Sequence, residues 1–125
     1  MWYDYLSKTE YLHRLYEDIP SLNDVRIARI AISDEGNRVT MIFDIPKYAD
    51  FPPIKWDGCN VVVIEIDFFC ITKLQLDTIS NTYRGDISIE KNLDGLLKIN
   101  VKGSLNINIV AEHGLVQHIS AYRKK

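Results

Sequence analysis

The first twenty residues carry apolar side chains at the spacing of an α-helix. Four of them recur on one helical face: Tyr11, Leu12, Leu15 and Tyr16. Ser7 and Glu10 have the spacing of a capping box, in which each side chain bonds the backbone of the other residue, and Pro20 is a residue type at which helices end. The pattern predicts one short helix over residues 8–18, packed on the rest of the chain through Leu12 and Leu15.

After residue 24 the apolar positions alternate with polar ones, which is the period of a half-buried β-strand. The alternation occurs in eight segments: residues 25–32, 39–45, 61–69, 74–76, 87–89, 97–101, 105–109 and 115–121. Turn-forming sequences separate several of them: Asp34-Glu35-Gly36-Asn37, Asp94-Gly95, Gly103-Ser104 and Gly114. The alternation changes parity near Ala28, which predicts a β-bulge there.

These segments predict a mostly β fold of about eight strands. We expect an antiparallel sandwich or a strongly curved meander, with the helix at an edge or an end. Residues 74–76 either continue the preceding strand or form a further one. Glu65 and Asp67 alternate with apolar residues, so we expect both carboxylates on the solvent side of their strand. With 125 residues and no low-complexity tract, the chain should form one domain over residues 1–125.

The charge balance argues against a nucleic-acid partner, because a net charge of −2 gives no field that attracts nucleic acid. Residues 34–70 hold seven acids and three bases, a net of −4, and residues 91–125 hold two acids and six bases, a net of +4. Folding either mixes these charges or separates them into two regions. No apolar run approaches a membrane span and no apolar leader begins the chain, so we expect a cytoplasmic protein without a membrane partner.

The residue types that usually catalyse reactions or bind metals show no recognised arrangement. His13, His113 and His118 lack the spacing of a metal site, and no nucleophile motif or phosphate-binding glycine loop is present. The sequence therefore predicts neither an enzyme nor a cofactor. Cys59 and Cys70 are the only cysteines. A chain able to build its own core needs no disulfide, so we expect two free thiols.

One proline-rich segment, residues 46–58, concentrates aromatic side chains beside charged ones. Prolines lower the entropy lost on binding, and aromatic residues beside charges are typical of interface hot spots. We expect a partner-binding surface built from six residues: Asp44, Tyr48, Asp50, Phe51, Trp56 and Asp57. The three acids and Tyr48 should be exposed, and Trp56 at least partly buried. Alternatively, Phe51 and Trp56 close one end of the β-structure; both interpretations can hold together.

The sequence resembles the immunity protein 50 family of bacterial polymorphic toxin systems. The resemblance lies in short motifs spread over nearly the whole chain: Met1-Trp-Tyr, Pro20-Ser21-Leu22, Val25-Arg26, Phe43-Asp44-Ile45-Pro46, Pro52-Pro53-Ile54-Lys55-Trp56, Asp67-Phe68-Phe69, Asp94-Gly95-Leu96-Leu97-Lys98 and Ile119-Ser120-Ala121-Tyr122. The resemblance implies a mostly β protein that neutralises a cognate toxin without catalysis. It supplies no site residues and no cofactor.

Three functions remain to be compared. The first is an immunity protein that binds and blocks a toxin; an acidic patch on it would suit a basic toxin, because charge complementarity speeds association. The second is a small-ligand or carbohydrate-binding β module, which a deep pocket lined by Trp56 and Tyr83 would favour. The third is an enzyme, which the convergence of Cys59 with two histidines would favour. The sequence leaves a homodimer open.

Overall fold

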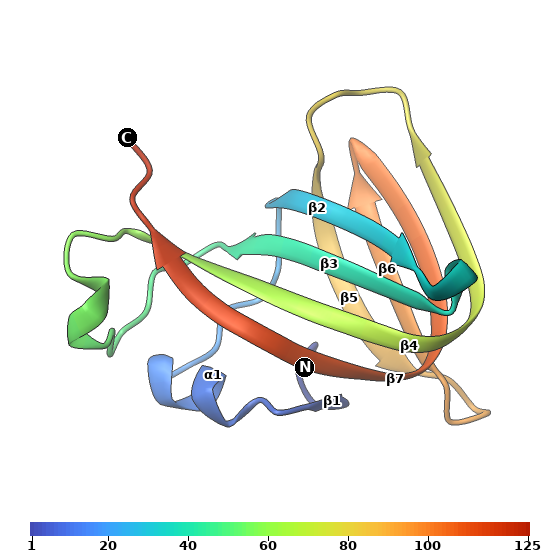
Figure 1. The fold of residues 1–125 in the computed structure, drawn as a ribbon, viewed down its shortest axis with the longest axis horizontal. Helices are drawn as coiled ribbons and strands as arrows, with labels where there is room; N and C mark the ends of the chain where they lie inside the picture. Colours follow the sequence, from blue (N-terminus) through green and yellow to red (C-terminus); the bar gives the residue numbers. More distant parts are fainter.

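The fold is mostly β, as the alternating pattern predicts. The structure is a computed structural model that describes residues 1–125. The chain forms one short α-helix, two short turns of 3-10 helix and seven strands, which are arranged as in Figure 1. In chain order the elements are β1 (Leu6–Ser7), α1 (Glu10–Leu15), β2 (Val25–Ser33), η1 (Asp34–Gly36), β3 (Arg38–Ile45), η2 (Ile54–Trp56), β4 (Val61–Thr78), β5 (Arg84–Lys91), β6 (Leu97–Gly103) and β7 (Leu105–Tyr122).

The strands form one strongly curved sheet that closes on itself. Neighbours follow the order β1-β7-β4-β3-β2-β5-β6, and a further ladder joins β6 back to β7. All pairs are antiparallel except β1 with β7, where Leu6 and Ser7 run parallel to Gly114 and Leu115. The ladder that joins β2 to β5 has only two residue pairs, Val25 with Gly85 and Arg26 with Arg84.

Two strands are far longer than the pattern indicates. Residues 61–69 and 74–76 belong to the single 18-residue strand β4, and residues 105–109 and 115–121 belong to the 18-residue strand β7. The two strands stay paired throughout because register shifts at Glu65/Ile66 and Ile71/Lys73 let them bend without ending. Two pairs of predicted segments therefore each form one strand, and the short strand β1 was not predicted. The result is seven strands where about eight were expected.

Gly114 lies inside β7 and forms no turn, contrary to the prediction. A Cβ atom built at Gly114 would lie 2.7 Å from a side-chain carbon of Leu6 and 2.9 Å from the ring of Phe68. The glycine therefore allows β1 to pack closely on β7. Two further local predictions hold: the register of β2 on β3 shifts between Ile27 and Arg29, and residues 34–37 form the hairpin connection.

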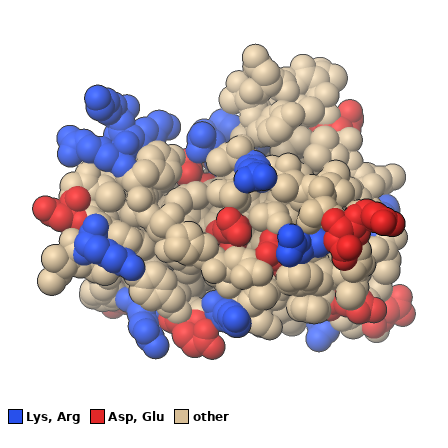
Figure 2. Space-filling view, in the orientation of Figure 1, with Lys and Arg blue, Asp and Glu red and all other residues tan.

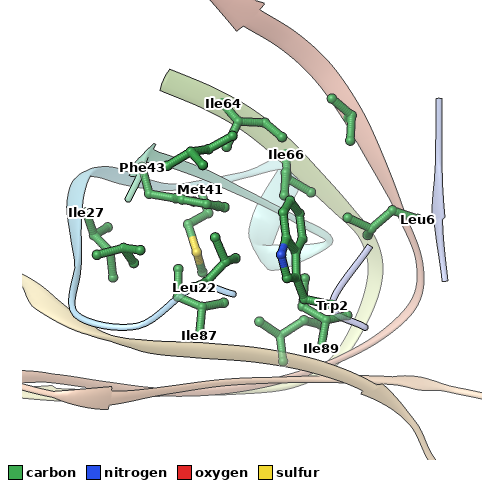
Figure 3. Close-up of a cluster of buried hydrophobic side chains, with 14 of the residues drawn as sticks. Trp2, Leu6, Leu22, Ile27, Met41, Phe43, Ile64, Ile66, Ile87 and Ile89 are labelled. Atoms are coloured by element: carbon green, nitrogen blue, oxygen red, sulfur yellow. The ribbon is translucent and has the colours of Figure 1, made fainter. Parts of the chain in front are cut away.

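The interior of the closed sheet is filled by the inward side chains of its strands. The segment before β2 adds six buried residues to the same core: Trp2, Leu6, Leu12, Leu15, Tyr16 and Leu22. Figure 3 shows Trp2 and Leu22 entering the core between facing strands. The Trp2 indole N–H donates to the Pro20 carbonyl at 2.9 Å, which satisfies its one polar atom. Leu12 and Leu15 are 0% and 1% exposed, which confirms that the helix packs through them.

The helix is shorter than the predicted residues 8–18, and its capping box does not form. Ser7 pairs with β7, Lys8 has a positive φ of 61°, and the N-cap is Thr9, without a side-chain cap bond. The helix ends at Leu15 because that carbonyl accepts the amide of Phe51, 3.0 Å away, and the backbone of the following residue is extended. No helix of this structure has the length and apolar character to cross a membrane.

Candidate functional site

The connection between β3 and β4, residues 46–60, projects from one end of the sheet (Figure 1, left). We call it the aromatic loop. Pro46, Pro52 and Pro53 keep it out of the ladder because proline has no amide to donate. Three consecutive turns then fold its second half: the amides of Trp56, Asp57 and Cys59 donate to the carbonyls of Pro53, Ile54 and Trp56 at 2.9–3.1 Å. The loop thus has a defined backbone.

Trp56 anchors the aromatic loop on the body of the protein. Its side chain is 6% exposed, as the prediction of at least partial burial requires. Its ring centroid lies 6.2 Å from that of Tyr11 in an edge-to-face arrangement and 6.5 Å from that of Tyr48 in a tilted one. Trp56 therefore closes this end of the β-structure, whereas Phe51 does not, because its side chain is 59% exposed.

The first half of the aromatic loop is fastened to the helix region. The Phe51 amide donates to the Leu15 carbonyl, and the Tyr16 hydroxyl donates to the Lys47 carbonyl at 2.5 Å. Asp50 accepts the amide of Glu17 at 3.0 Å and forms an ion pair with Lys47 at 2.9 Å. The Lys47 hydrogen bond and the Glu17 amide hold the pKa of Asp50 below its ordinary value. Asp50 thus has an internal structural role, although the residue is exposed as expected.

Burial raises the pKa of the Tyr16 phenol well above 10.0, and the charge of Asp50 adds to this shift. Tyr16 is therefore a neutral donor at physiological pH, and its bond to the Lys47 carbonyl persists. For Tyr48, burial followed by the proximity of Cys59 and Asp57 likewise raises the pKa. Neither phenol is poised to act as a base near neutrality.

Among the side chains that the aromatic loop turns outward are Phe51, Ile54 and Asp57. Tyr48, which the sequence predicted to be exposed, is half-buried beside them because its ring packs near Trp56. Ile54 is 95% exposed, and the sequence analysis did not single it out. The sequence feature that could have indicated its exposure is its position after two prolines, because an apolar residue there does not lie on the buried face of a strand. A hollow of about 440 Å³ opens beside these residues, lined in part by Tyr48, Ile54 and Trp56. We call Tyr48, Phe51, Ile54 and Asp57 the loop face.

Asp44 is buried, which corrects the expectation that it is exposed. It lies on the outer face of β3 and is only 9% exposed. Its Oδ2 accepts the Tyr122 hydroxyl at 2.7 Å and Arg26 Nη1 at 3.3 Å, while its Oδ1 is buried without a partner. The side chains of Arg26 and Tyr122, which come from β2 and β7, bond this carboxylate and shield it from water. Asp44 therefore is not part of the loop face.

Asp67 is the second carboxylate whose surroundings differ from expectation. It is 5% exposed, where the alternation placed it on the solvent side. It accepts hydrogen bonds from the Thr40 hydroxyl and from Gln117 Nε2, the latter at 2.7 Å. Thr40 lies directly opposite Asp67 in the β3–β4 ladder, and Gln117 belongs to β7. The outer face of this part of the sheet thus contains two buried polar networks.

The charges that the sequence separates are mixed at the loop end. Within the aromatic loop, Lys47 and Lys55 balance Asp50 and Asp57. The basic C-terminus lies alongside: Arg123 Nη1 donates to the Gly58 carbonyl at 3.4 Å, and Lys124 and Asn60 exchange two hydrogen bonds at 2.7 and 2.9 Å. Figure 2 shows basic side chains gathered where Figure 1 places the C-terminus. Asp34 and Glu35 lie in η1, beyond the opposite end of β3. Of the two alternatives that the sequence left open, folding therefore mixes the charges here, and no acidic patch forms at the loop end.

The histidines and cysteines lie in separate surroundings. No three His, Cys, Asp or Glu side chains converge in a metal-binding arrangement. The ring of His113 stacks on Phe69, and the ring of His13 meets Tyr3 edge-on. Cys59 and Cys70 are unpaired thiols, and a hydrogen bond with Glu112 raises the pKa of Cys70. Raising that pKa disfavours the reactive thiolate.

The single pocket lined by Trp56 and Tyr83 that would favour a small-ligand module does not form. Trp56 and Tyr83 line two different hollows, the first beside the aromatic loop and the second between β2 and the start of β5. The indole ring of Trp56 also packs against tyrosine rings, so little of its face remains for a sugar.

Comparisons with known proteins identify the fold and the family of this chain. The fold resembles the crystal structure of an uncharacterized protein from Neisseria gonorrhoeae, with a TM-score of 0.50 and 19% sequence identity over 78% of this chain and 91% of that chain. At that identity the likeness shows the fold alone. No protein of curated function gives a significant match. The family model described as immunity protein 50 matches residues 8–122, nearly the whole length. This chain belongs to the immunity protein 50 family.

Proposed function

We propose that this protein neutralises a cognate bacterial toxin by binding it, without catalysis, and that the loop face is the main contact. Family membership implies the immunity role. The observation that supports the location is the pair of large apolar side chains, Phe51 and Ile54, that a fixed backbone holds at 59% and 95% exposure. Exposed apolar groups on an ordered segment are a feature of protein interaction sites.

The backbone of the aromatic loop is organised before any partner binds. Two adjacent prolines, three loop turns and the bonds of Phe51 and Asp50 to the helix region all restrict it. Association then costs less conformational entropy than it would for a flexible loop. Beneath the loop face, Trp56 and Tyr11 supply a packed base. Because Trp56 also packs against Tyr48, such a base keeps Tyr48 in place when a partner presses against it.

The charges around the loop face favour a partner different from the basic toxin that the sequence suggested. Arg123, which bonds the loop at Gly58, forms a group of like charges with the two C-terminal lysines beside the loop, and the loop itself sums to zero. A toxin surface with an apolar patch flanked by acidic side chains therefore fits this end of the molecule best. Apolar contacts would set the dissociation rate, and the C-terminal bases would set the association rate.

Co-expression with the toxin tests this proposal. Cells that make the toxin should survive with the wild-type protein and die with Phe51→Asp or Ile54→Asp, because a carboxylate in an apolar contact is costly to desolvate. Leu93→Asp is the matched control, since Leu93 is fully exposed on a different turn. Survival with both loop variants, each shown to be folded, would exclude the loop face.

Stoichiometry separates binding from catalysis. A binding inhibitor abolishes toxin activity only when the two proteins reach equal amounts, and the toxin keeps its mass. Inactivation of a large excess of toxin by a small amount of this protein would contradict a non-catalytic mechanism.

A second candidate function, binding of a small polar ligand such as a sugar, is supported by a different surface. A hollow of about 640 Å³ lies over β4, β6 and β7, and six polar residues line it: Gln75, Asp77, Asn100, Lys102, Asn106 and Asn108. The Oδ1 of Asn108 is buried there without a partner. Amide chemical shifts of Asn100 and Asn108 during titration with simple sugars test this candidate, and unchanged shifts would exclude those sugars.

A further inference from the structure

The second half of β4 has a free edge. On one side, β4 pairs with β7 along its whole length, to Thr78 opposite Leu105. On the other side, its ladder with β3 ends where Phe69 faces Arg38, and the last backbone contact on that side is the Ile71 amide with the Asn37 carbonyl at 3.4 Å. No strand of the protein pairs with residues 72–78 on this side. Figure 1 shows this end of β4 at the right margin, with no element beyond it.

A free strand edge presents unpaired amides and carbonyls, and it invites pairing with another strand. Proteins usually block such an edge with charges, and Lys73 is exposed here as such a blocking residue would be. However, Asp77, four residues further along the same strand, is also exposed, so the edge carries one charge of each sign. The edge also leaves apolar groups uncovered: Leu76 is 43% exposed, and Ile79 is fully exposed just beyond the strand.

The sequence of this edge is complementary to itself in antiparallel orientation. Residues 72–78 are Thr-Lys-Leu-Gln-Leu-Asp-Thr. A two-fold axis through Gln75 places Lys73 opposite Asp77 of a second copy, Leu74 opposite Leu76, and Gln75 opposite Gln75. The same symmetry continues outward to Thr72 with Thr78 and to Ile71 with Ile79. Opposite charges, paired leucines and paired threonines are all favourable cross-strand neighbours.

The two faces of the strand agree with this register. Leu74 and Leu76 lie opposite Ile109 and Ile107 of β7, which are core residues, so both leucines belong to the inward face. Lys73, Gln75 and Asp77 lie on the other face. Self-pairing would therefore join apolar side chains on one face and charged or amide side chains on the other, as the pleat of a sheet requires.

We propose that this protein forms a two-fold symmetric dimer through antiparallel pairing of the β4 edge, residues 73–77, with the same edge of a second copy. Charge complementarity identifies the occupant as a second copy, because the one lysine and the one aspartate of the edge satisfy each other only in this register. A two-fold contact uses the same edge in both copies, so it closes at the dimer and does not grow into a fibre.

The regular pairing is short. The register shift between Ile71 and Lys73 makes Thr72 an extra residue, so the ladder of β4 is irregular on that side of Lys73. Five residue pairs form a small interface, and the dimer should exchange with monomer as concentration changes. The aromatic loop lies at the other end of the molecule (Figure 1), so a dimer leaves the loop face free on both copies. The dimer is therefore independent of the proposed toxin contact.

Analytical ultracentrifugation of the wild-type protein from about 1 µM to about 1 mM covers the range in which weak interfaces associate. The mass should rise from 14.5 kDa toward twice that value. Lys73→Asp places two aspartates opposite each other at both ends of the pairing, and Asp77→Lys places two lysines there. Each single variant should dimerise at least about tenfold more weakly.

Two further samples separate charge pairing from general disruption. The double variant Lys73→Asp/Asp77→Lys restores opposite charges and should dimerise like the wild type. A mixture of the two single variants should form a heterodimer, because both of its charge pairs are then complementary. Lys98→Asp, an equal charge change on exposed β6, is the control and should leave dimerisation unchanged. A wild-type protein that stays monomeric throughout, or single variants that dimerise normally, would overturn the proposal.

Discussion

The hydroxyl of Tyr122, near the C-terminus, donates a 2.7 Å hydrogen bond to Asp44 of β3 across the intervening strand β4. Asp44 is 9% exposed, and one of its two oxygens already lacks a partner. The bond therefore links two strands that are not neighbours, on the outer face of the sheet and next to the aromatic loop.

Replacing Tyr122 with phenylalanine should destabilise the protein by about 1–3 kcal/mol, because a buried carboxylate then loses its shortest hydrogen bond. Urea unfolding measures this change. Tyr5→Phe is the matched control, since Tyr5 is exposed and its hydroxyl forms no hydrogen bond in the protein; it should change stability little. Equal stability of both variants would show that Arg26 alone satisfies Asp44.

Tyr16 should make the protein sensitive to alkali. Burial raises its pKa above 10.0 in the folded state, so the unfolded chain loses this proton at a lower pH than the folded protein does. Its contribution to stability is therefore complete below about pH 10 and is lost as the pH rises from there toward the folded pKa. The free energy of unfolding of Tyr16→Phe should fall less steeply above pH 10 than that of the wild type. Parallel curves would contradict the shift.

Leu15→Ala should destabilise the protein by about 2–4 kcal/mol, because Leu15 is 1% exposed and its removal leaves a cavity between the helix and the sheet. Chemical denaturation measures this, with Leu93→Ala as the control on an exposed turn. A loss below about half a kcal/mol would show that the helix readjusts to fill the space.

The C-terminal bases should steer the toxin if its surface is acidic. Lys124→Ala should then slow association at low salt, and Asp57→Ala should speed it, with little effect of either on dissociation. Both effects should fade at high salt, because the screening length is about 8 Å at physiological ionic strength. Stopped-flow binding measures the rates. Slower association of the Asp57 variant would show that the toxin surface is basic.

The alternation of apolar and polar residues was enough to predict the strands, because each strand of this sheet has one face in the core. It could not predict that β4 and β7 are continuous, because a bend within one strand and a turn between two strands have similar local sequences. Gly114 illustrates this. A glycine is required there because a Cβ would collide with Leu6 and Phe68, which are distant in sequence.

The candidate site was predicted in part. Proline content and the aromatic residues located the loop and the burial of Trp56 correctly. The burial of Asp44 and Asp67 depends on long side chains from neighbouring strands, which alternation does not describe. The position of the C-terminal bases beside the loop arises from strand order, which the sequence pattern does not contain.

The closure of the sheet between β2 and β5 rests on two residue pairs, whereas β3 and β4 share eight. Arg84 reinforces this short ladder through bonds to Asp24, but the Asp24 side chain is largely exposed to solvent and that of Arg84 is partly exposed. Native-state fluctuations should therefore begin there, with β2 and β5 parting while β3, β4 and β7 stay together. Amides of Val25 to Ile27 should exchange with deuterium sooner than those of Ile64 to Phe68. The molecule is then a rigid three-strand body with a hinge-like opening on the side remote from β7.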